Sequence, residues 1–261
     1  MRGDVLSSTT RVALITGGAG LIGSEVCAQL AAAGVSVVVN GRDRDRCEAA
    51  AGRVRAMSEH HQAVAAVADV SDYAECVRLV GEVEAAFGRL DMLIHCALSP
   101  TPGLTGPFER TDPARYAALM QQAVCAPMNI CHAALPALKR SGGGSIVAFP
   151  SDAGKVAAPN QTMVGATRAA VMMFMRSLAL EVSADAIRCN CIAPTYVDSP
   201  QMRSAMESGP HAARISSAAA RARLGLPTPG ELAALAVFLC SPAAGHLTGQ
   251  VISVNGGLSA A

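Results

Sequence analysis

The sequence contains no tryptophan, and aromatic residues of all kinds make up only 3% of its 261 residues. Stacking sites for nucleic-acid bases or sugar rings depend on such side chains, so we expect neither kind of site. Charge of one sign is not in excess either, because the formal net charge is +1. A nearly neutral chain gives no electrostatic reason to bind nucleic acid or a membrane surface.

Long hydrophobic runs are also missing, because no apolar stretch approaches the roughly 20 residues of a membrane-spanning helix. The first ten residues, MRGDVLSSTT, are polar, and we expect residues 1–10 to form a flexible N-terminus without a signal peptide. The nine cysteines include no CxxC pair. Such cysteines are typical of small buried side chains in a cytoplasmic protein, and we expect no metal site.

What the sequence does contain is a regular alternation of short β-branched runs and helical patterns, with 51% hydrophobic residues. We expect strands at 11–18, 35–41, 63–70, 90–97, 144–150, 186–194 and 250–257, and helices at 24–34, 46–57, 73–88, 112–140 in pieces, 160–182 and 229–241. This alternation predicts a Rossmann-type α/β fold, a doubly wound parallel sheet with helices on both faces. We expect one domain over residues 11–261, with the least regular segment, about 195–228, as a lid over the ligand-binding edge.

A glycine-rich turn, ALITGGAGLIGSEV, joins the first strand to the first helix. Gly17 permits a tight turn, Gly20 lets a pyrophosphate approach the backbone, and Gly23 lets helix and strand pack closely. The helix that follows offers N–H groups and a positive dipole end. The second strand ends without an acid, and Arg42 follows it, which favours NADP over NAD.

These features, with ADV at 68–70, GGGSIV at 142–147, IRCNCIAPTYVDSP at 187–200 and LTGQVISVNGG at 247–257, resemble the short-chain dehydrogenase/reductase family, single-domain type. The resemblance covers residues 11 to 257. It implies an NAD(P) site that includes Gly17, Gly20, Ile22, Gly23, Arg42, Asp69 and Val70. The glycine spacing departs from the single-domain pattern and matches that of the family's extended members.

The resemblance also implies four active-site positions, an Asn, a Ser, a Tyr and a Lys. Here the serine is retained as Ser151. The tyrosine position, the general acid/base, is Val164, which has no proton to give. The lysine position is Arg168, which stays cationic and does not enter a proton relay. Counting back from Leu135, the asparagine position is Ala123, with Asn129 nearby, so we expect a degenerate active site.

Substitutes for the missing tyrosine are few. Tyr196 follows the Pro194 turn near the expected substrate. His95 and Cys96 are adjacent on a strand and point to opposite faces, so they do not form a nucleophile–base pair. Asp152 has no histidine partner, which argues against a hydrolase triad. Leu98 stands where the family has a glycine after the fourth strand, and its side chain crowds the cofactor. The cofactor site is therefore either functional, vestigial or absent.

The helix that should carry the tyrosine, GATRAAVMMFMRSLALEV, is apolar nearly all round, which suggests burial against a partner. The resemblance implies a four-helix subunit interface there. We therefore expect a non-catalytic subunit of a hetero-oligomeric NAD(P)-dependent alcohol or hydroxyacyl(-CoA) dehydrogenase, paired with an active homologue as a dimer of dimers. Two alternatives remain: an active oxidoreductase with a non-standard acid, and an NADP(H)-sensing regulatory protein.

Overall fold

The computed structural model describes residues 10–58, 60, 62–97, 105–208 and 212–260. Leu98 and all but the last residue of the predicted flexible N-terminus, 1–10, lie outside this part. Its centre is a seven-stranded parallel sheet of order β3-β2-β1-β4-β5-β6-β7, which confirms the predicted doubly wound topology. The strands are β1 (Val12–Thr16), β2 (Ser36–Gly41), β3 (Ala63–Val67), β4 (Met92–His95), β5 (Gly144–Ala148), β6 (Ile187–Pro194) and β7 (Val251–Val254).

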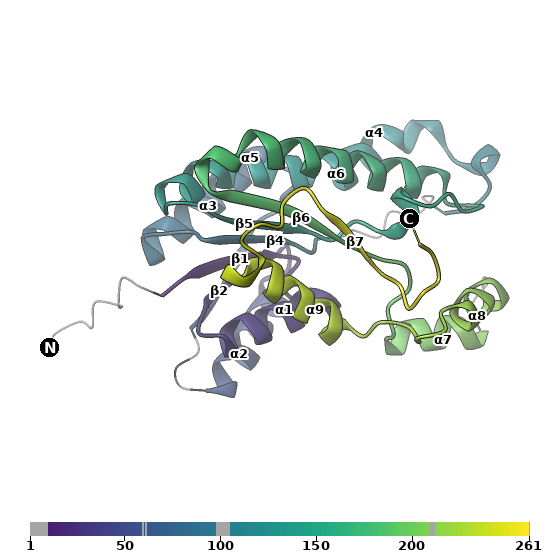
Figure 1. Cartoon of the computed structure of the whole chain (residues 1–261), viewed down its shortest axis with the longest axis horizontal. Coiled ribbons are helices and arrows are strands. Elements are labelled where there is room, and N and C mark those ends of the chain that lie inside the picture. Colours follow the sequence, from purple (N-terminus) through teal and green to yellow (C-terminus); the bar gives the residue numbers. More distant parts are fainter. Residues whose placement is uncertain (1–9, 59, 61, 98–104, 209–211, 261) are drawn as a thin grey trace, which may run out of the picture.

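Helices cover both faces of the sheet, as the alternating pattern predicts (Figure 1). Helices α3, α5 and α6 pack on one face and α1, α2 and α9 on the other, so that the core has two halves. The α-helices are α1 (Leu21–Ala32), α2 (Arg44–Met57), α3 (Tyr73–Phe87), α4 (Tyr116–Met120), α5 (Ala126–Arg140), α6 (Thr162–Glu181), α7 (Pro200–Ser208), α8 (Ala212–Arg221) and α9 (Pro229–Cys240). The shorter turns are η1 (Phe108–Arg110), η2 (Pro113–Arg115), η3 (Gln121–Cys125), η4 (Asp152–Gly154), η5 (Ser183–Asp185) and η6 (Pro242–Ala244).

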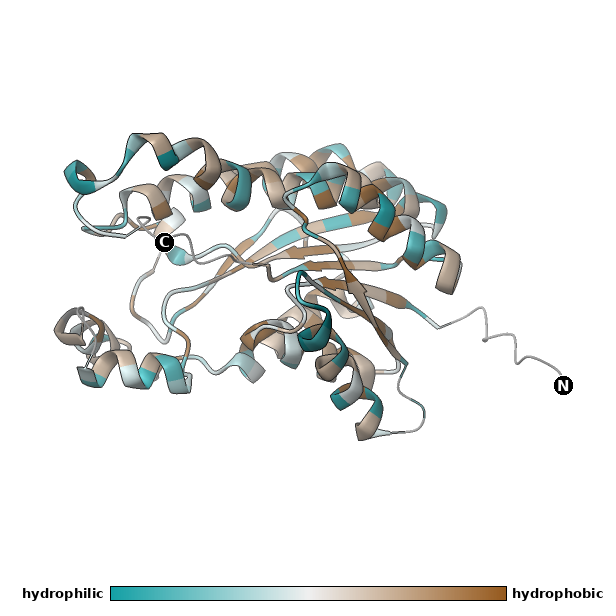
Figure 2. Cartoon of the chain, turned by 180° about the vertical axis from the view of Figure 1, so that it is seen from behind, coloured by the Kyte–Doolittle hydropathy of each residue, from teal (hydrophilic) through white to brown (hydrophobic). Residues whose placement is uncertain are grey.

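The central strands are continuous apolar runs because both of their faces are covered. All five residues of β1 are buried, and Figure 2 shows brown strands between helices whose outer sides carry teal. In the register of the sheet, Thr16 at the end of β1 lies opposite Asn40 of β2 and His95 of β4. The turns after these three strands therefore meet at one edge, where the direction of winding reverses and ligands bind in such sheets.

Local signals fix where the helices begin and end. The Asp72 carboxylate accepts a hydrogen bond from the Ala74 amide at the start of α3, and Gly88, with φ of +72°, ends that helix. At α9, Thr228 and Glu231 form a reciprocal capping box. These caps explain why the predicted helix boundaries lie within a few residues of the observed ones.

The segment predicted as least regular, 195–228, contains the two helices α7 and α8, which lie beyond the carboxyl edge of the sheet (Figure 1). Ile215 and Ala218 lie on one face of α8 and are buried, as is Ala222 directly after the helix. This spacing of three and four residues is helical, but the many Ser, Ala and Arg residues around it weaken the apolar pattern. The segment is therefore helical over two stretches, which the sequence did not predict, and its role as a lid stays a prediction.

Within the described ranges, α6 is long and apolar enough to cross a membrane by length and composition, contrary to the expectation that no run approaches this length. In the fold it lies against the sheet and buries Val171, Met175 and Leu178 in the core. It also carries Arg168 and Arg176. A long helix that packs on a wide sheet needs many apolar residues, which is why the mean hydropathy of α6 is high.

Candidate functional site

The glycine turn between β1 and α1 has the geometry that the sequence predicts. Gly17 adopts φ of +67°, and a Cβ there would lie 2.7 Å from the backbone of Ala97. At Gly23 a Cβ would lie 2.3 Å from the carbonyl oxygen of Gly17, so the helix packs directly on the turn. Gly20 is the N-cap of α1 and no side chain caps this helix end. The first N–H groups of α1 are therefore left for an anion.

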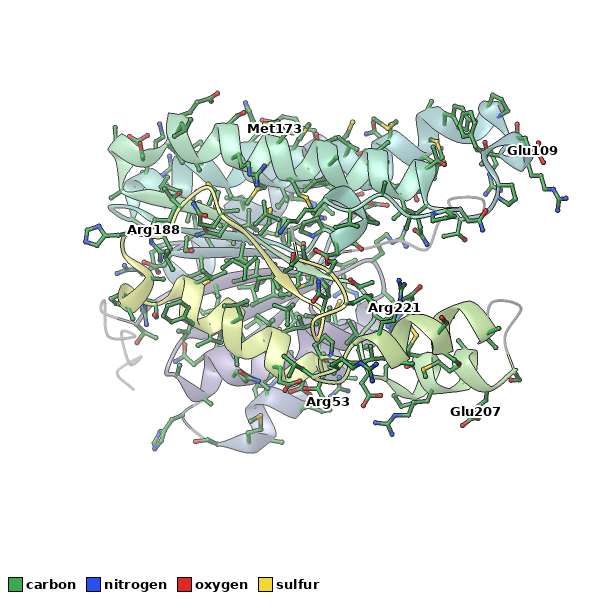
Figure 3. The ribbon with its side chains drawn as sticks, turned by 45° about the vertical axis from the view of Figure 1, so that its right-hand side comes forward. Arg53, Glu109, Met173, Arg188, Glu207 and Arg221 are labelled. Carbon is green, nitrogen blue, oxygen red and sulfur yellow. The ribbon has the colours of Figure 1, made fainter. Side chains whose placement is uncertain are left out.

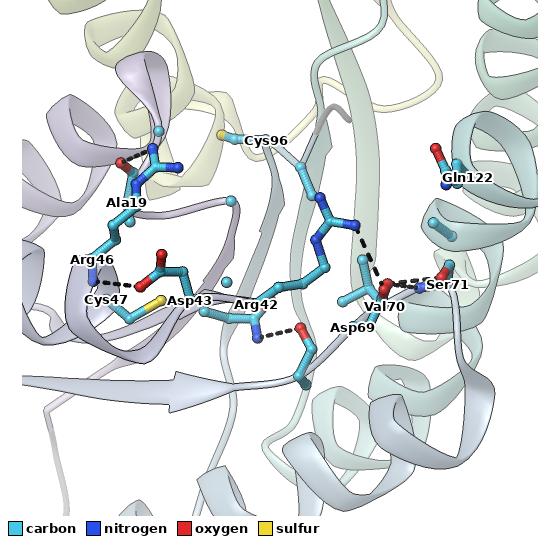
Figure 4. Close-up of a pocket in the computed structure, with 17 residues that line it drawn as sticks. Ala19, Arg42, Asp43, Arg46, Cys47, Asp69, Val70, Ser71, Cys96 and Gln122 are labelled. Atoms are coloured by element: carbon cyan, nitrogen blue, oxygen red, sulfur yellow. Dashed lines mark hydrogen bonds and ion pairs between the residues drawn. The ribbon is translucent and has the colours of Figure 1, made fainter. Parts of the chain in front are cut away.

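A pocket of about 450 Å³ opens beside this turn (Figure 4). Of the predicted cofactor residues, Gly17, Gly20, Arg42, Asp69 and Val70 line it. The other two lie behind the turn, where Gly23 contacts Gly17 and Ile22 packs against the buried core under α1. The fold therefore brings all seven predicted residues together: five of them line the pocket, and two shape the turn beside it.

Arg42 and Asp69 face each other across the pocket, with 3.8 Å between Nη1 and Oδ2 (Figure 4). Ser71 donates to Asp69 from its amide at 2.9 Å and from its hydroxyl at 2.8 Å. Burial raises the pKa of the Asp69 carboxyl, but the bonds from Ser71 and the charge of Arg42 outweigh it and lower the pKa. Asp69 therefore stays ionised and holds Arg42 over the pocket.

A second arginine, Arg46, lines the same pocket, and the sequence reasoning missed it. It lies in the first turn of α2, where the Asp43 carboxylate caps its amide at 3.0 Å. Its guanidinium donates to the carbonyl of Ala19 in the glycine turn at 3.5 Å. The available signal was its position four residues after Arg42, in the first turn of the helix that follows the second strand.

The loop after β5 carries the retained serine. Ser151 Oγ accepts a 3.4 Å hydrogen bond from the amide of Ala153, as the N-cap of η4. This loop packs directly on α6, because a Cβ at Gly154 would lie 2.7 Å from the backbone of Ala169. Ser151 therefore lies against the helix that carries the tyrosine and lysine positions.

Those two positions, Val164 and Arg168, lie one turn apart in α6. The Arg168 side chain is 7% exposed, and within the described part of the chain it has no hydrogen bond or ion pair. Burial lowers the pKa of its guanidinium, which remains a cation. A buried cation without an acceptor is costly, and an oxygen of a ligand would lower that cost.

His95 and Cys96 do not supply the missing acid. Thr16 Oγ1 and His95 Nδ1 lie 2.8 Å apart in a buried hydrogen bond. Burial, assisted by the charge of Arg168, lowers the pKa of His95 to about 4, so the imidazole is neutral at pH 7. Burial raises the pKa of the Cys96 thiol well above its usual value, and its side chain packs against the core. Neither side chain has the protonation state of a general acid or a nucleophile.

Ala123, at the asparagine position, is buried in η3, a π-helical segment between α4 and α5. Such segments are frequent at functional sites because they widen a helix locally. Nearby Asn129 does not replace it, since its amide donates to the carbonyl of Ser71 at 3.1 Å and its side chain lines a groove outside the cleft.

A second pocket, of about 440 Å³, lies between the Ser151 loop, the end of β6 and α8. Ser151 and Tyr196 both line it, as do Arg221 from α8 and Ser259 near the C-terminus. The Tyr196 hydroxyl makes no hydrogen bond to any described residue. Ser151 and residues of α8 therefore line the same pocket, which has room for a small organic molecule.

A buried carboxylate fastens the C-terminal segment to this pocket. Asp152 accepts hydrogen bonds from the hydroxyls of Ser253 and Ser259, both at 2.6 Å, and from the amide of Asn255. Burial raises the pKa of Asp152, but these bonds and the charge of Lys155 outweigh it and lower the pKa. Lys155 itself donates to Ser253 at 2.8 Å. Asp152 therefore has a structural role.

Among the described residues, no group of three or more His, Cys, Asp or Glu side chains has the geometry of a metal site. Seven of the nine cysteines are buried and all nine are free thiols.

Three comparisons with known proteins bear on this site. A family model described as enoyl-(acyl carrier protein) reductase matches residues 18–259. A tropinone reductase homologue of Arabidopsis thaliana is 33% identical, over 95% of this chain and 92% of its own. An acetoacetyl-CoA reductase of Rhizobium meliloti is 32% identical, over 95% and 98%.

Solved structures give the same relation. A short-chain type dehydrogenase/reductase from Mycobacterium ulcerans is 31% identical, with a TM-score of 0.88 over 95% of this chain and 89% of its own. A gluconate 5-dehydrogenase from Burkholderia cenocepacia, in complex with NADP and tartrate, is 29% identical, with a TM-score of 0.85 over 95% and 94%. The L-sorbose reductase of Gluconobacter frateurii, complexed with NADPH and L-sorbose, is 28% identical, with a TM-score of 0.86 over 95% and 96%.

Proposed function

The chain belongs to the short-chain dehydrogenase/reductase family, and from that premise we propose that it binds NADP(H) but lacks a proton donor of its own. Its role is that of a non-catalytic subunit in a hetero-oligomeric NAD(P)-dependent dehydrogenase of alcohols or hydroxyacyl compounds. The observation that carries this proposal is Val164, which stands in α6 where the resemblance places the acid. A valine side chain has no proton to give, and Arg168, always protonated, does not replace it.

The missing donor limits the chemistry more than the binding. A positioned general acid contributes about 10²–10⁴-fold to a rate, and neutral His95 and buried Cys96 do not supply it. Ser151 remains at the pocket wall and has a hydroxyl for a substrate oxygen. The chain alone therefore retains the means to hold substrate and cofactor without the group that protonates the product.

The residues present fit NADP(H). The pyrophosphate would lie on the uncapped N-terminus of α1, beside Gly17 and Gly20. Arg42 and Arg46 would pair with the 2′-phosphate, and buried Arg168 would hold ribose oxygens at the nicotinamide end. When bound, the nicotinamide supplies or accepts hydride. The complexes of the Burkholderia and Gluconobacter enzymes with NADP and NADPH support this preference.

The proposed partner is an active homologue that docks on the outer face of α5 and α6. On this face Leu180 is 78% exposed and Met173 is 58% exposed, and Figure 3 shows Met173 pointing outward from α6. A groove of about 570 Å³ beside them is lined by Phe174, Leu178 and Tyr73, among others. Exposed apolar side chains grouped in this way are typical of a protein interface, and the resemblance implies a four-helix contact here.

One observation favours a second candidate, an active oxidoreductase with Tyr196 as its acid. Tyr196 lines the same pocket as Ser151, and among the described residues its hydroxyl has no partner. In that case the purified chain would oxidise NADPH with a carbonyl substrate, and Tyr196→Phe would abolish the reaction.

The first experiment is the native mass of the complex from its own cells, with every subunit identified. We expect an assembly with a second family member that carries Ser, Tyr and Lys. A homo-oligomer that turns over NADPH would refute the proposal, and a homo-oligomer that binds NADPH without turnover would instead favour a regulatory protein.

A restoration experiment tests the mechanism separately. The triple variant Val164→Tyr, Arg168→Lys, Ala123→Asn returns the three altered positions to the family's residues. We expect this variant to oxidise NADPH slowly. The matched control carries Val164→Phe in place of Val164→Tyr, which supplies the ring without the hydroxyl, and should not oxidise NADPH. If the unaltered chain oxidises NADPH as fast as the triple variant, Val164 does not limit the reaction.

A further inference from the structure

The pocket beside Ser151 is lined by one positively charged side chain. Arg221, the last residue of α8, lines this pocket, and Figure 3 shows it on the side of α8 that faces the body of the molecule. Arg221 has no hydrogen bond or ion pair to any residue that the structure describes. Arg203 in α7, by contrast, forms an ion pair with Asp198 at 2.7 Å.

The rest of the pocket has the character of a binding site for a small, partly apolar molecule. Val156, Ala158 and Leu258 supply apolar wall, and Gln161, Tyr196 and Ser217 supply polar groups. Within the described ranges, the side chains of these three polar residues make no hydrogen bond. Several polar groups that converge on an apolar cavity without using one another are what a specific small-molecule site requires.

The one acid of the pocket wall is already committed elsewhere. Asp152 directs its oxygens to Ser253, Asn255 and Ser259, and its lowered pKa keeps it ionised. Asp152 therefore does not pair with Arg221, and its negative charge disfavours an anionic group beside Ser151. The charges of the pocket are arranged with the negative group at the Ser151 end and the positive group at the α8 end, which orients an asymmetric ligand.

We propose that this pocket binds a small hydroxy or keto carboxylic acid, with the carboxylate on Arg221 and the hydroxyl or carbonyl oxygen at Ser151. Among the described wall residues Arg221 is the one cation, so its single charge matches a carboxylate, which its guanidinium holds through two parallel hydrogen bonds, better than a phosphate, which carries nearly two negative charges. This inference names the substrate class of the proposed function and rests on it only in taking this pocket as the substrate pocket.

The test is equilibrium binding to the full-length chain, by calorimetry, with and without NADP. The probes are 3-hydroxybutyrate and gluconate, each beside an uncharged counterpart, methyl 3-hydroxybutyrate and sorbitol. We expect at least one acid to bind and its neutral counterpart to bind about 10- to 100-fold more weakly. Arg221→Gln should lower the affinity for the acid by the same factor, and Arg221→Lys should keep part of that affinity. Arg223 is an exposed neighbour outside the pocket, so Arg223→Gln should leave the affinity unchanged.

Several results would overturn the inference: no binding of either acid, equal binding of acid and neutral counterpart, or unchanged affinity in Arg221→Gln. Tighter binding of glycerol 3-phosphate than of both acids would also overturn it, in favour of a phosphate. None of these measurements depends on turnover. NADPH oxidation by the purified chain would contradict the proposed non-catalytic role and leave the carboxylate site standing.

Discussion

The buried histidine at the end of β4 makes the stability of this protein depend on pH in a defined window. Burial, with the charge of Arg168, lowers the pKa of His95 to about 4 from 6.5. Between these values the unfolded chain binds a proton that the folded chain does not. His95 therefore lowers the free energy of unfolding as pH falls from 6.5 toward 4, and has no such effect above 6.5.

The magnitude follows from the two pKa values. At pH 5 the linkage amounts to about 2 kcal/mol, and below pH 4 it approaches about 3 kcal/mol. His95→Asn removes the titration and keeps a polar partner for Thr16, so this variant should lose about 2 kcal/mol less stability than the wild type between pH 7 and pH 5. Urea unfolding at half-unit steps of pH measures the difference, and acids that titrate in both proteins cancel from it.

Two controls separate this cause from others. His246 is exposed, so His246→Asn should leave the pH dependence as it is in the wild type. Arg168→Met removes the second cause of the shift, and the His95 resonances in an NMR titration should then change at a higher pH. The reasoning fails if His95→Asn and the wild type lose equal stability between pH 7 and pH 5.

Three further outcomes follow from the same structure. Arg42→Ala should weaken NADPH binding about 10-fold and NADH binding little, by fluorescence titration; equal losses would contradict the 2′-phosphate role. Gly23→Ala places a Cβ 2.3 Å from a carbonyl oxygen, so it should lower the free energy of unfolding by about 2–4 kcal/mol, whereas Gly81→Ala, with open space around it, should not. Asp152→Ala removes the acceptor of four side-chain donors and should cost about 3 kcal/mol in urea unfolding; a cost below 1 kcal/mol would show that the cluster does not stabilise the fold.

The three positions at which we propose that the family's residues are lost do not line the pocket beside the glycine turn. Val164, Arg168 and Ala123 lie on the α5 and α6 side, whereas the glycine turn, Arg42 and Asp69 lie beside β1, β2 and β3. Loss of the proton donor therefore requires no change in the residues that bind the adenine end of a dinucleotide. This separation is why binding without turnover is a physically consistent state for the chain.

The sequence by itself determined the order of elements, the parallel sheet and the glycine turn. These features depend on local patterns: β-branched runs with period two or continuous apolarity, helical spacing, caps, and glycines at fixed offsets. The roles of Ser151, Val164 and Arg168 come from the resemblance to the family and stay predictions, while their places in one loop and one helix follow from the sequence order. The predicted irregular segment was the weakest part, because the helical stripe of α8 is short and surrounded by small polar residues.

Only the tertiary structure decided which side chains share a site. Asp152 meets Ser253 and Ser259 across about a hundred residues of chain, and Arg221 reaches the Ser151 loop from a separate lid. The low pKa of His95 likewise depends on burial and on Arg168, which lies on another element. A sequence pattern encodes neighbours three or four residues apart, whereas these partners are brought together by crossover connections and by burial, which no local pattern contains.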